Sequence, residues 1–190
     1  MITDRRQFNL GLTTALFGLG MSHSSSAQKS ENSTATGSNA IHHYFFKDLT
    51  FEMIFLTSLG RAYHCGGNVG KVLYLTRQVE DGNFESAYLA FKQAGDEARL
   101  LAEELASGGH KESARQAYLW AQNFYDSATY FIDGSKDPKR FLPTWELLYD
   151  CWLKAVPLFE PAVEPVRIPY EGTELHGFFF RGNGISKKRP

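Results

Sequence analysis

The sequence is poor in cysteine, in net charge and in long apolar runs, and each shortage argues against a class of protein. Two cysteines, Cys65 and Cys151, are too few for a disulfide framework, so we interpret them as buried free thiols and leave a single bridge open. The formal net charge is −1, without the basic excess that nucleic-acid binding requires. The short basic run 187–189 is interpreted as a solvated tail. We therefore expect no nucleic-acid partner.

Motifs for metals and cofactors are also scarce. His42 and His43 are adjacent, so their side chains point in different directions, and neither has a Cys or carboxylate partner at ligand spacing. His64 and the two cysteines would need a further ligand that no spacing nominates. The glycine-rich segment 66–70 lacks the Lys-Ser/Thr of a phosphate-binding loop and is interpreted as the entry to a helix. The sequence predicts neither a metal nor a cofactor.

Bulky core material is what the chain does have. Hydrophobic residues make up 43% of the chain and aromatic residues 14%. Its 190 residues suffice for one domain of ordinary size, or for one domain and a fragment of another. Aromatic side chains should supply much of the core.

Two helical runs between Asn83 and Ile132 form the centre of the expected fold, separated by Gly108-Gly109-His110. In each run, apolar residues recur at steps of three and four, the period of one helix face. The first face carries Phe84, Ala87, Tyr88, Phe91, Ala94, Ala98, Leu101 and Leu105, and the second carries Ala114, Ala117, Tyr118, Ala121, Phe124, Tyr125, Ala128 and Phe131. Because large aromatics alternate with alanines, we predict a closely packed antiparallel pair.

Shorter helical patterns flank this pair. Between residues 44 and 63, apolar residues recur with mostly helical spacing at Phe46, Leu49, Met53, Phe55, Leu56 and Leu59. Asn68 and Asn83 are placed to cap the helices that follow them, and Asp133-Gly134 should end the second central helix. Another helix is predicted over residues 143–159, with prolines marking its end.

After Pro165 the period changes from helical to alternating. Val166, Ile168 and Tyr170 alternate with other residues, and Glu171-Gly172 supplies a turn before a second apolar stretch. This pattern predicts a β-hairpin. Since an isolated hairpin is only marginally stable in water, we expect the chain to stop just after a sheet has begun.

Residues 1–27 resemble a twin-arginine export signal. Arg5 and Arg6 precede Phe8, a weakly apolar run follows, and small residues at 25–27 suit cleavage. About 12 apolar residues fall short of the ~20 needed to span a bilayer, so we expect no stable membrane anchor. Residues 28–43 are rich in Ser, Asn, Thr and Gly, which predicts a disordered linker. Together these features predict a bacterial protein that is periplasmic or secreted.

Four short motifs follow one another along the rest of the chain. They are Gly66-Gly67-Asn68-Val69-Gly70-Lys71, Asp81-Gly82-Asn83-Phe84-Glu85-Ser86-Ala87-Tyr88, Gly109-His110-Lys111-Glu112-Ser113-Ala114-Arg115-Gln116-Ala117-Tyr118 and Ile168-Pro169-Tyr170-Glu171-Gly172. In this order the motifs resemble the amino-terminal part of the α/β-hydrolases related to the fermentation-respiration switch esterases and to 2,6-dihydroxypseudooxynicotine hydrolase. The resemblance covers residues 44–181.

The resemblance implies a mostly α fold, in which an antiparallel helical bundle is followed by a β-hairpin that begins an α/β-hydrolase sheet. Residues 44–162 would form a helical cap domain, 163–182 the hairpin and 183–190 a tail. Hydrolases of this group place a serine nucleophile in a Gly-x-Ser-x-Gly turn, and cleave ester, amide or carbon–carbon bonds.

The Gly-x-Ser-x-Gly motif does not occur in these 190 residues. We therefore expect this chain to lack the nucleophile, the catalytic triad and the oxyanion hole, and to be truncated before the catalytic core. By itself it should be inert. A small-molecule substrate would be a partner of the full-length protein only.

Because the cap of this group faces the substrate, the resemblance nominates Tyr118, Trp145 and Trp152 as substrate-lining residues. Aromatic residues at helical spacing also suit a core, so that interpretation stays open. No catalytic residue is nominated. Trp120 and Asp126 stand where the group tends to carry arginines, so a differently charged pocket is expected.

A second function comes from another class of protein. A free-standing periplasmic helical module would bind a small aromatic ligand or a partner protein through its Trp and Tyr face. Homo-oligomerisation is also left open.

Overall fold

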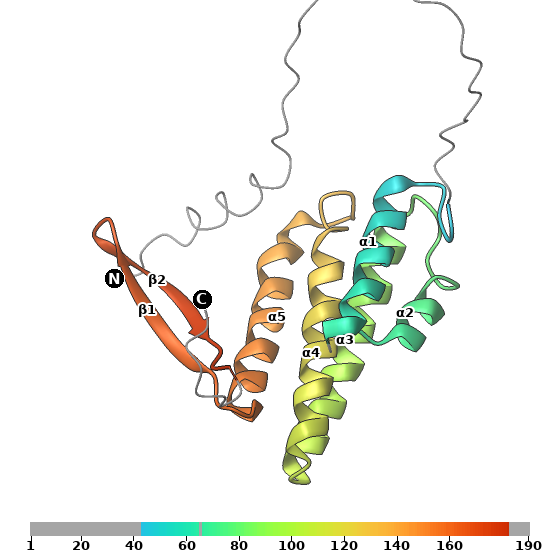
Figure 1. The fold of residues 1–190 in the computed structure, drawn as a ribbon. Helices are drawn as coiled ribbons and strands as arrows, with labels where there is room; N and C mark the ends of the chain where they lie inside the picture. Colours follow the sequence, from blue (N-terminus) through green and yellow to red (C-terminus); the bar gives the residue numbers. More distant parts are fainter. Residues whose placement is uncertain (1–42, 65, 183–190) are drawn as a thin grey trace, which may run out of the picture. The chain divides into compact units, whose positions relative to one another are not determined.

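A computed structural model describes residues 43–64 and 66–182, so the predictions for residues 1–42, for Cys65 and for the tail 183–190 lie outside it. The described part is mostly helical and ends in a pair of strands (Figure 1). In chain order its elements are α1 Leu49–Gly60, η2 Arg61–His64, α2 Val69–Leu75, α3 Phe84–Ser107, α4 Lys111–Thr129, η3 Pro138–Arg140, α5 Phe141–Ala155, η4 Val156–Leu158, β1 Glu164–Tyr170 and β2 Thr173–Phe179. No helix within the described ranges is long and apolar enough to cross a membrane.

The two central helices, α3 and α4, lie side by side and are joined by a tight turn (Figure 1). Asn83 caps α3 by accepting a hydrogen bond from the Ser86 N–H, and Asn68 caps α2 in the same way through the Lys71 N–H. Between α3 and α4, Gly109 adopts a φ of 77°, a conformation that glycine takes without strain. Both predicted caps and the predicted break at residues 108–110 are confirmed.

The face predicted for α4 is buried in full. Each of its eight residues, from Ala114 to Phe131, is at most 5% exposed. On α3 the prediction is wrong at one position, because Leu101 is 42% exposed and Ala102 is buried instead. Ala102 lies four residues after Ala98 and so continues the same stripe, whereas Leu101 is turned toward the side of the helix.

Phenylalanine rings form the centre of the core. Phe91 of α3 stacks on Phe131, with ring centroids 5.8 Å apart and planes inclined by 13°. Phe55 of α1 packs against Phe91 at 4.8 Å, and Phe51 packs against Phe131 at 4.9 Å. These aromatic contacts fix α1 against the central helices.

The structure corrects the apolar series that the sequence suggested for α1. Leu49, Met53 and Leu56 are exposed, whereas Phe51 and Phe55 are buried. The physical reason is that α1 carries apolar residues on both sides, so its periodicity does not select one face.

Glu52 is the most unusual buried residue of α1. It is 3% exposed, and its carboxylate accepts hydrogen bonds from the backbone N–H groups of Tyr44, Phe45 and Phe46 at 2.8, 3.1 and 3.0 Å. Burial alone would raise the pKa of Glu52, but these three donors outweigh it and lower the pKa. The carboxylate thereby holds the segment before α1 against the helix.

Two predicted helix boundaries shift. α4 ends at Thr129 and not at Asp133-Gly134, because the chain turns tightly from Tyr130 onward. The next helix, α5, begins at Phe141 and not at residue 143, since η3 leads directly into it, and it ends at Ala155 where η4 begins.

The predicted hairpin is confirmed. β1 pairs antiparallel with β2, so that Ile168 lies opposite Leu175 and Tyr170 lies opposite Thr173. Glu171 and Gly172 join the strands with φ angles of 44° and 78°, the signs of a type I′ turn.

Candidate functional site

Two sides of α5 differ sharply in their surroundings. Thr144 and Cys151 are buried against the other helices, while Trp145 and Tyr149 lie on a side that is partly open to solvent. The rings of Trp145 and Tyr149 stack at 5.3 Å with an interplanar angle of 10°. Trp152 stands seven residues after Trp145 and therefore lies on the same side of the helix. We call Trp145, Tyr149 and Trp152 the α5 aromatic surface.

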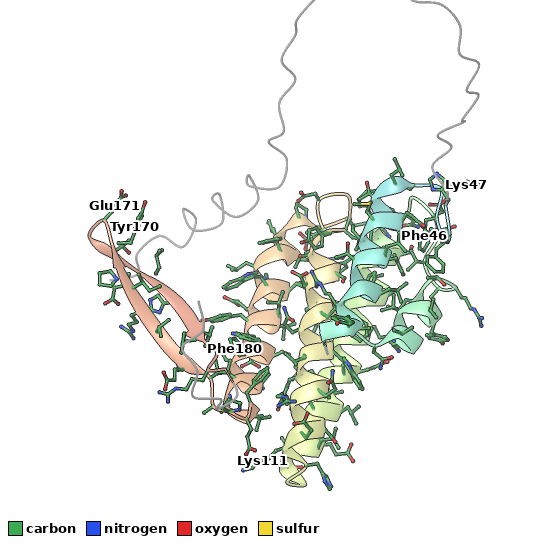
Figure 2. All side chains as sticks on the ribbon, in the orientation of Figure 1. Phe46, Lys47, Lys111, Tyr170, Glu171 and Phe180 are labelled. Carbon is green, nitrogen blue, oxygen red and sulfur yellow. The ribbon has the colours of Figure 1, made fainter. Side chains whose placement is uncertain are left out.

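Trp152 connects this surface with the hairpin. Its ring meets Phe178 of β2 edge-to-face at 5.4 Å, and it also contacts Phe159 at 6.2 Å and Phe180 at 6.3 Å. Phe159 packs in turn against Phe180 at 5.5 Å. Figure 2 labels Phe180 at the base of the hairpin beside α5. The base of the hairpin is therefore held by aromatic packing.

Phe159 also carries a cation on its other side. The Arg115 guanidinium of α4 lies 4.8 Å from the Phe159 ring centroid. This contact ties α4 to the same aromatic cluster. The sequence analysis did not identify Phe159, Phe178 or Arg115, and the adjacent phenylalanines 178–180 were the only signal available.

Tyr118 does not belong to the α5 aromatic surface. It is 5% exposed on the core side of α4, where burial raises the pKa of its phenol. The structure thus places Trp145 and Trp152 on one side of α5 and leaves Tyr118 inside the helical core.

Ion pairs line the seam between α3 and α5. Lys154 contacts Asp150 at 2.9 Å and Glu103 at 3.2 Å, and Arg99 contacts Glu103 at 2.9 Å. The hydrogen bond from Lys154 to Asp150 is the largest cause that raises the pKa of the Lys154 amine. These charges neutralise one another and leave the seam without a net field for a charged ligand.

A hollow of about 160 Å³ lies between α2, α3 and α4. Its lining is given by Asn68, Lys71, Ala94, Glu97, Ala98, Leu101, Trp120 and Phe124. Lys71 and Glu97 form an ion pair at 2.5 Å. The indole nitrogen of Trp120 is buried and has no hydrogen-bond partner among the described residues. The resemblance had placed Trp120 at an arginine position, and here it contributes an apolar wall.

Asp126, the other residue at an arginine position, is engaged elsewhere. Its carboxylate pairs with Arg61 at 2.5 Å, and Arg61 also donates to the Asn123 amide oxygen at 2.8 Å. Asn123 is fully buried and donates to Ser58 at 3.2 Å. This network joins the end of α1 to α4.

A second, more open hollow of about 490 Å³ lies where α3 begins. Asp81 and Glu85 contribute to it, but both carboxylates are already bound. Asp81 accepts the backbone N–H groups of Lys47 and Asp48, and Glu85 accepts Arg140 at 2.8 and 2.9 Å.

The described residues are suited to binding more than to bond cleavage. Burial raises the pKa of the Cys151 thiol to about 12, which keeps it protonated near neutral pH. Within the described ranges no group of three His, Cys, Asp or Glu side chains is arranged to hold a metal ion. The α5 aromatic surface, with exposed apolar area beside charged neighbours, is the candidate site.

Comparisons with known proteins relate the chain to hydrolases. No protein-family model matches it. The alpha/beta hydrolase xenA of Xenoacremonium sinensis is 31% identical over 137 residues, which cover 72% of this chain and 32% of that protein. Hydrolase ORFZ of Pyricularia oryzae is 32% identical over 133 residues, covering 68% of this chain and 31% of the relative. The alpha/beta hydrolase psoB of Aspergillus fumigatus is 29% identical over 141 residues, covering 73% and 32%.

The chain spans about a third of the length of the curated relatives it matches. It is therefore related in sequence to proteins named alpha/beta hydrolase, over a region that is a minority of each relative. These three relatives are fungal, so they lend no support to the prediction of a bacterial source.

Proposed function

We propose that these residues form the helical cap and first hairpin of an α/β-hydrolase whose catalytic residues lie outside this chain. The observation that carries the proposal is 31% identity to an alpha/beta hydrolase over 72% of the chain. The order of elements, helices followed by a hairpin, agrees with the cap and sheet edge that the sequence resemblance implies.

In the complete protein, a serine hydroxyl would attack the carbonyl carbon of an ester, an amide or a ketone beside the carbon–carbon bond to be cleaved. A histidine would accept the serine proton and pass it to the leaving group, while an oxyanion hole would stabilise the tetrahedral intermediate. None of these groups is assigned to the 190 residues, so their contribution is to cover and select the substrate.

The α5 aromatic surface is the part proposed to face a small-molecule substrate. Trp145 and Tyr149 present a stacked pair of rings, 38% of Tyr149 being exposed, that suits an apolar or aromatic group. Trp152 would shape the surface and hold the hairpin. Tyr118 would act from inside, by supporting the contact between α4 and α5.

The second candidate, a free-standing module for a small aromatic ligand or partner protein, is favoured by the same exposed ring stack. In that case the 190-residue chain would bind an aromatic ligand by itself. Export to the bacterial periplasm through residues 1–27 is a proposal common to both functions.

The test compares two proteins. The DNA that follows this coding sequence is read for a frame encoding Gly-x-Ser-x-Gly, and the continuous product is purified beside the 190-residue chain. We expect the longer product to hydrolyse p-nitrophenyl esters in a reaction blocked by serine reagents, and the 190-residue chain to show no turnover.

Serine-reagent-sensitive turnover by the 190-residue chain would overturn the proposal. An unrelated downstream gene, together with quenching of Trp145 fluorescence by a small aromatic ligand, would favour the second candidate. In that titration Trp145→Phe is the variant that should lose the signal, and Glu146→Gln, an exposed neighbour on α5, is the matched control.

A further inference from the structure

The two edges of the hairpin differ in their capacity to bind another strand. In an antiparallel pair, residues alternate between positions that hydrogen bond across the pair and positions whose backbone groups point outward. Tyr170 and Thr173 flank a two-residue type I′ turn and are therefore bonded to each other. Counting from them along the register, the outward positions are Pro165, Arg167 and Pro169 on β1 and Glu174, His176 and Phe178 on β2.

Proline at an outward position removes the donor that a new strand would need. Two of the three outward positions of β1 are proline, so Arg167 supplies its single outward N–H. All three outward positions of β2 retain their N–H groups. The edge of β1 is thus protected against strand addition, and the edge of β2 is competent for it.

The hairpin needs further support at its tip. Its base is held by the contact of Phe178 with Trp152, whereas Ile168 is 54% exposed, Tyr170 53% and Leu175 36%. Figure 2 shows Tyr170 and Glu171 at the tip, away from the helices. Because two strands alone are marginally stable in water, additional strands would stabilise this part most.

We propose that two copies of this chain pair antiparallel through their β2 edges and form a four-stranded sheet. In the register we assign, Leu175 lies opposite the partner's Leu175 at the two-fold axis. Glu174 then lies opposite the partner's His176, and the symmetry repeats this pair on the other side.

This register is self-complementary in charge and in hydrophobic contact. The imidazole of His176 can donate a hydrogen bond to the carboxylate of the partner's Glu174, and opposite-charge or hydrogen-bonding pairs across strands stabilise a sheet. The two Leu175 side chains meet on the apolar face of the hairpin. A register centred on His176 would instead place Glu174 opposite the partner's Phe178 and gain neither pair.

The inference does not rest on the proposed function, because it concerns the 190-residue chain and uses only its backbone pattern and strand residues. A small interface of this kind should give a weak dimer that depends on concentration. Sedimentation equilibrium of the purified chain, up to about 200 µM, measures it directly.

His176→Pro is the decisive variant. It removes the central outward donor of β2 but no donor that β1 uses, so the hairpin should persist while association weakens by at least roughly tenfold. Arg167→Pro is the matched control, because Arg167 lies directly opposite His176 and its outward N–H belongs to the protected edge. Its dimer should dissociate at the wild-type concentration.

Two further variants keep the test informative if His176→Pro fails to fold. Leu175→Cys should form an intermolecular disulfide under mild oxidation, whereas Ile168→Cys, on the opposite strand, should not. Glu174→Lys should weaken the dimer by placing like charges together, and adding His176→Glu should restore it.

A wild-type chain that stays monomeric throughout this range overturns the proposal. So does a dimer that His176→Pro leaves intact, or a disulfide that forms equally well from residues 168 and 175. Loss of association in Arg167→Pro as well would assign the dimer to another surface and count equally against it.

Discussion

Gly95 of α3 lies directly beneath the ring of Tyr125 of α4. A Cβ atom at position 95 would come within 2.6 Å of the Tyr125 Cε1 atom, closer than any ordinary contact. Tyr125 is fully buried, and its hydroxyl donates to Asp96 at 2.7 Å and accepts from Arg99 at 3.4 Å. The missing side chain at residue 95 is what allows the two central helices to approach at this point.

Gly95→Ala should therefore destabilise the protein, although alanine is the better helix former. The gain in helix propensity is about 1 kcal/mol, whereas forcing a methyl group into a filled core costs about 1–3 kcal/mol. Because the Tyr125 ring is anchored at its hydroxyl, it cannot move aside cheaply, and we expect a net loss. Urea denaturation followed by circular dichroism measures it.

Gly60→Ala is the control for Gly95→Ala, since no atom lies within 4 Å of a Cβ at position 60. It should be neutral or slightly stabilising. Equal effects at the two positions would mean that the contact with Tyr125 does not limit the packing of α3 on α4.

Glu52→Gln should destabilise the protein at neutral pH and change its response to acid. The carboxylate accepts three backbone N–H groups, and an amide cannot replace it without turning an NH₂ group toward one of them, at a cost of roughly 1–3 kcal/mol. The folded-state pKa of Glu52 lies below its ordinary value of 4.5. Its stabilisation is therefore complete above that value and is lost as the pH falls through the lowered pKa.

The difference in unfolding free energy between wild type and Glu52→Gln should thus be largest near pH 7 and shrink below about pH 4.5. Chemical denaturation at a series of pH values tests this. Glu146→Gln, at an exposed position, should show no such difference. A wild-type minus Glu52→Gln difference that stays constant with pH would contradict the assigned role of the carboxylate.

Trp152→Ala should release the hairpin from α5. Removal of the indole eliminates its contacts with Phe159, Phe178 and Phe180, and we expect a loss of about 1–3 kcal/mol, less than for a fully buried tryptophan. Hydrogen exchange of the amides in β1 and β2 should accelerate. Trp145→Ala, which removes a ring stacked on Tyr149 only, should leave the hairpin amides protected.

Replacing Arg5 and Arg6 together by Lys should block export if residues 1–27 act as a twin-arginine signal. Lysine keeps the positive charge, so a signal that needs only charge would survive the change. Periplasmic and cytoplasmic yields in a bacterial host with this export route provide the measurement. Lys29→Arg, beyond the predicted cleavage site, is the control, and an unchanged periplasmic yield of the double variant would refute the export proposal.

Local features of the fold could be read from the sequence because their causes are local. Asn68 and Asn83 cap helices through atoms three residues away, and Glu171-Gly172 defines its own turn. The α4 face is amphipathic enough that its period fixes the buried side. The candidate residues Trp145 and Trp152 were also found in this way, since seven-residue spacing places them on one side of α5.

The failures occurred where the period is ambiguous or the partner is distant. α1 is apolar on both sides, so only its neighbours decide that Phe51 is buried and Met53 is not. Tyr118 fits a helical stripe, but no spacing tells whether that stripe faces a substrate or a core. Phe159 and Phe178 are 7 and 26 residues from Trp152, and no local pattern joins them.

The sequence by itself determined where helices begin, where the hairpin turns and which residues lie on each side of an element. It did so because capping, turn geometry and periodicity act within a few residues. The tertiary structure alone decided which sides meet: Gly95 under Tyr125, Glu52 around the preceding backbone, and Trp152 at the base of the hairpin. Those contacts join atoms of separate elements, and packing selects them from many pairings that the same local patterns would permit.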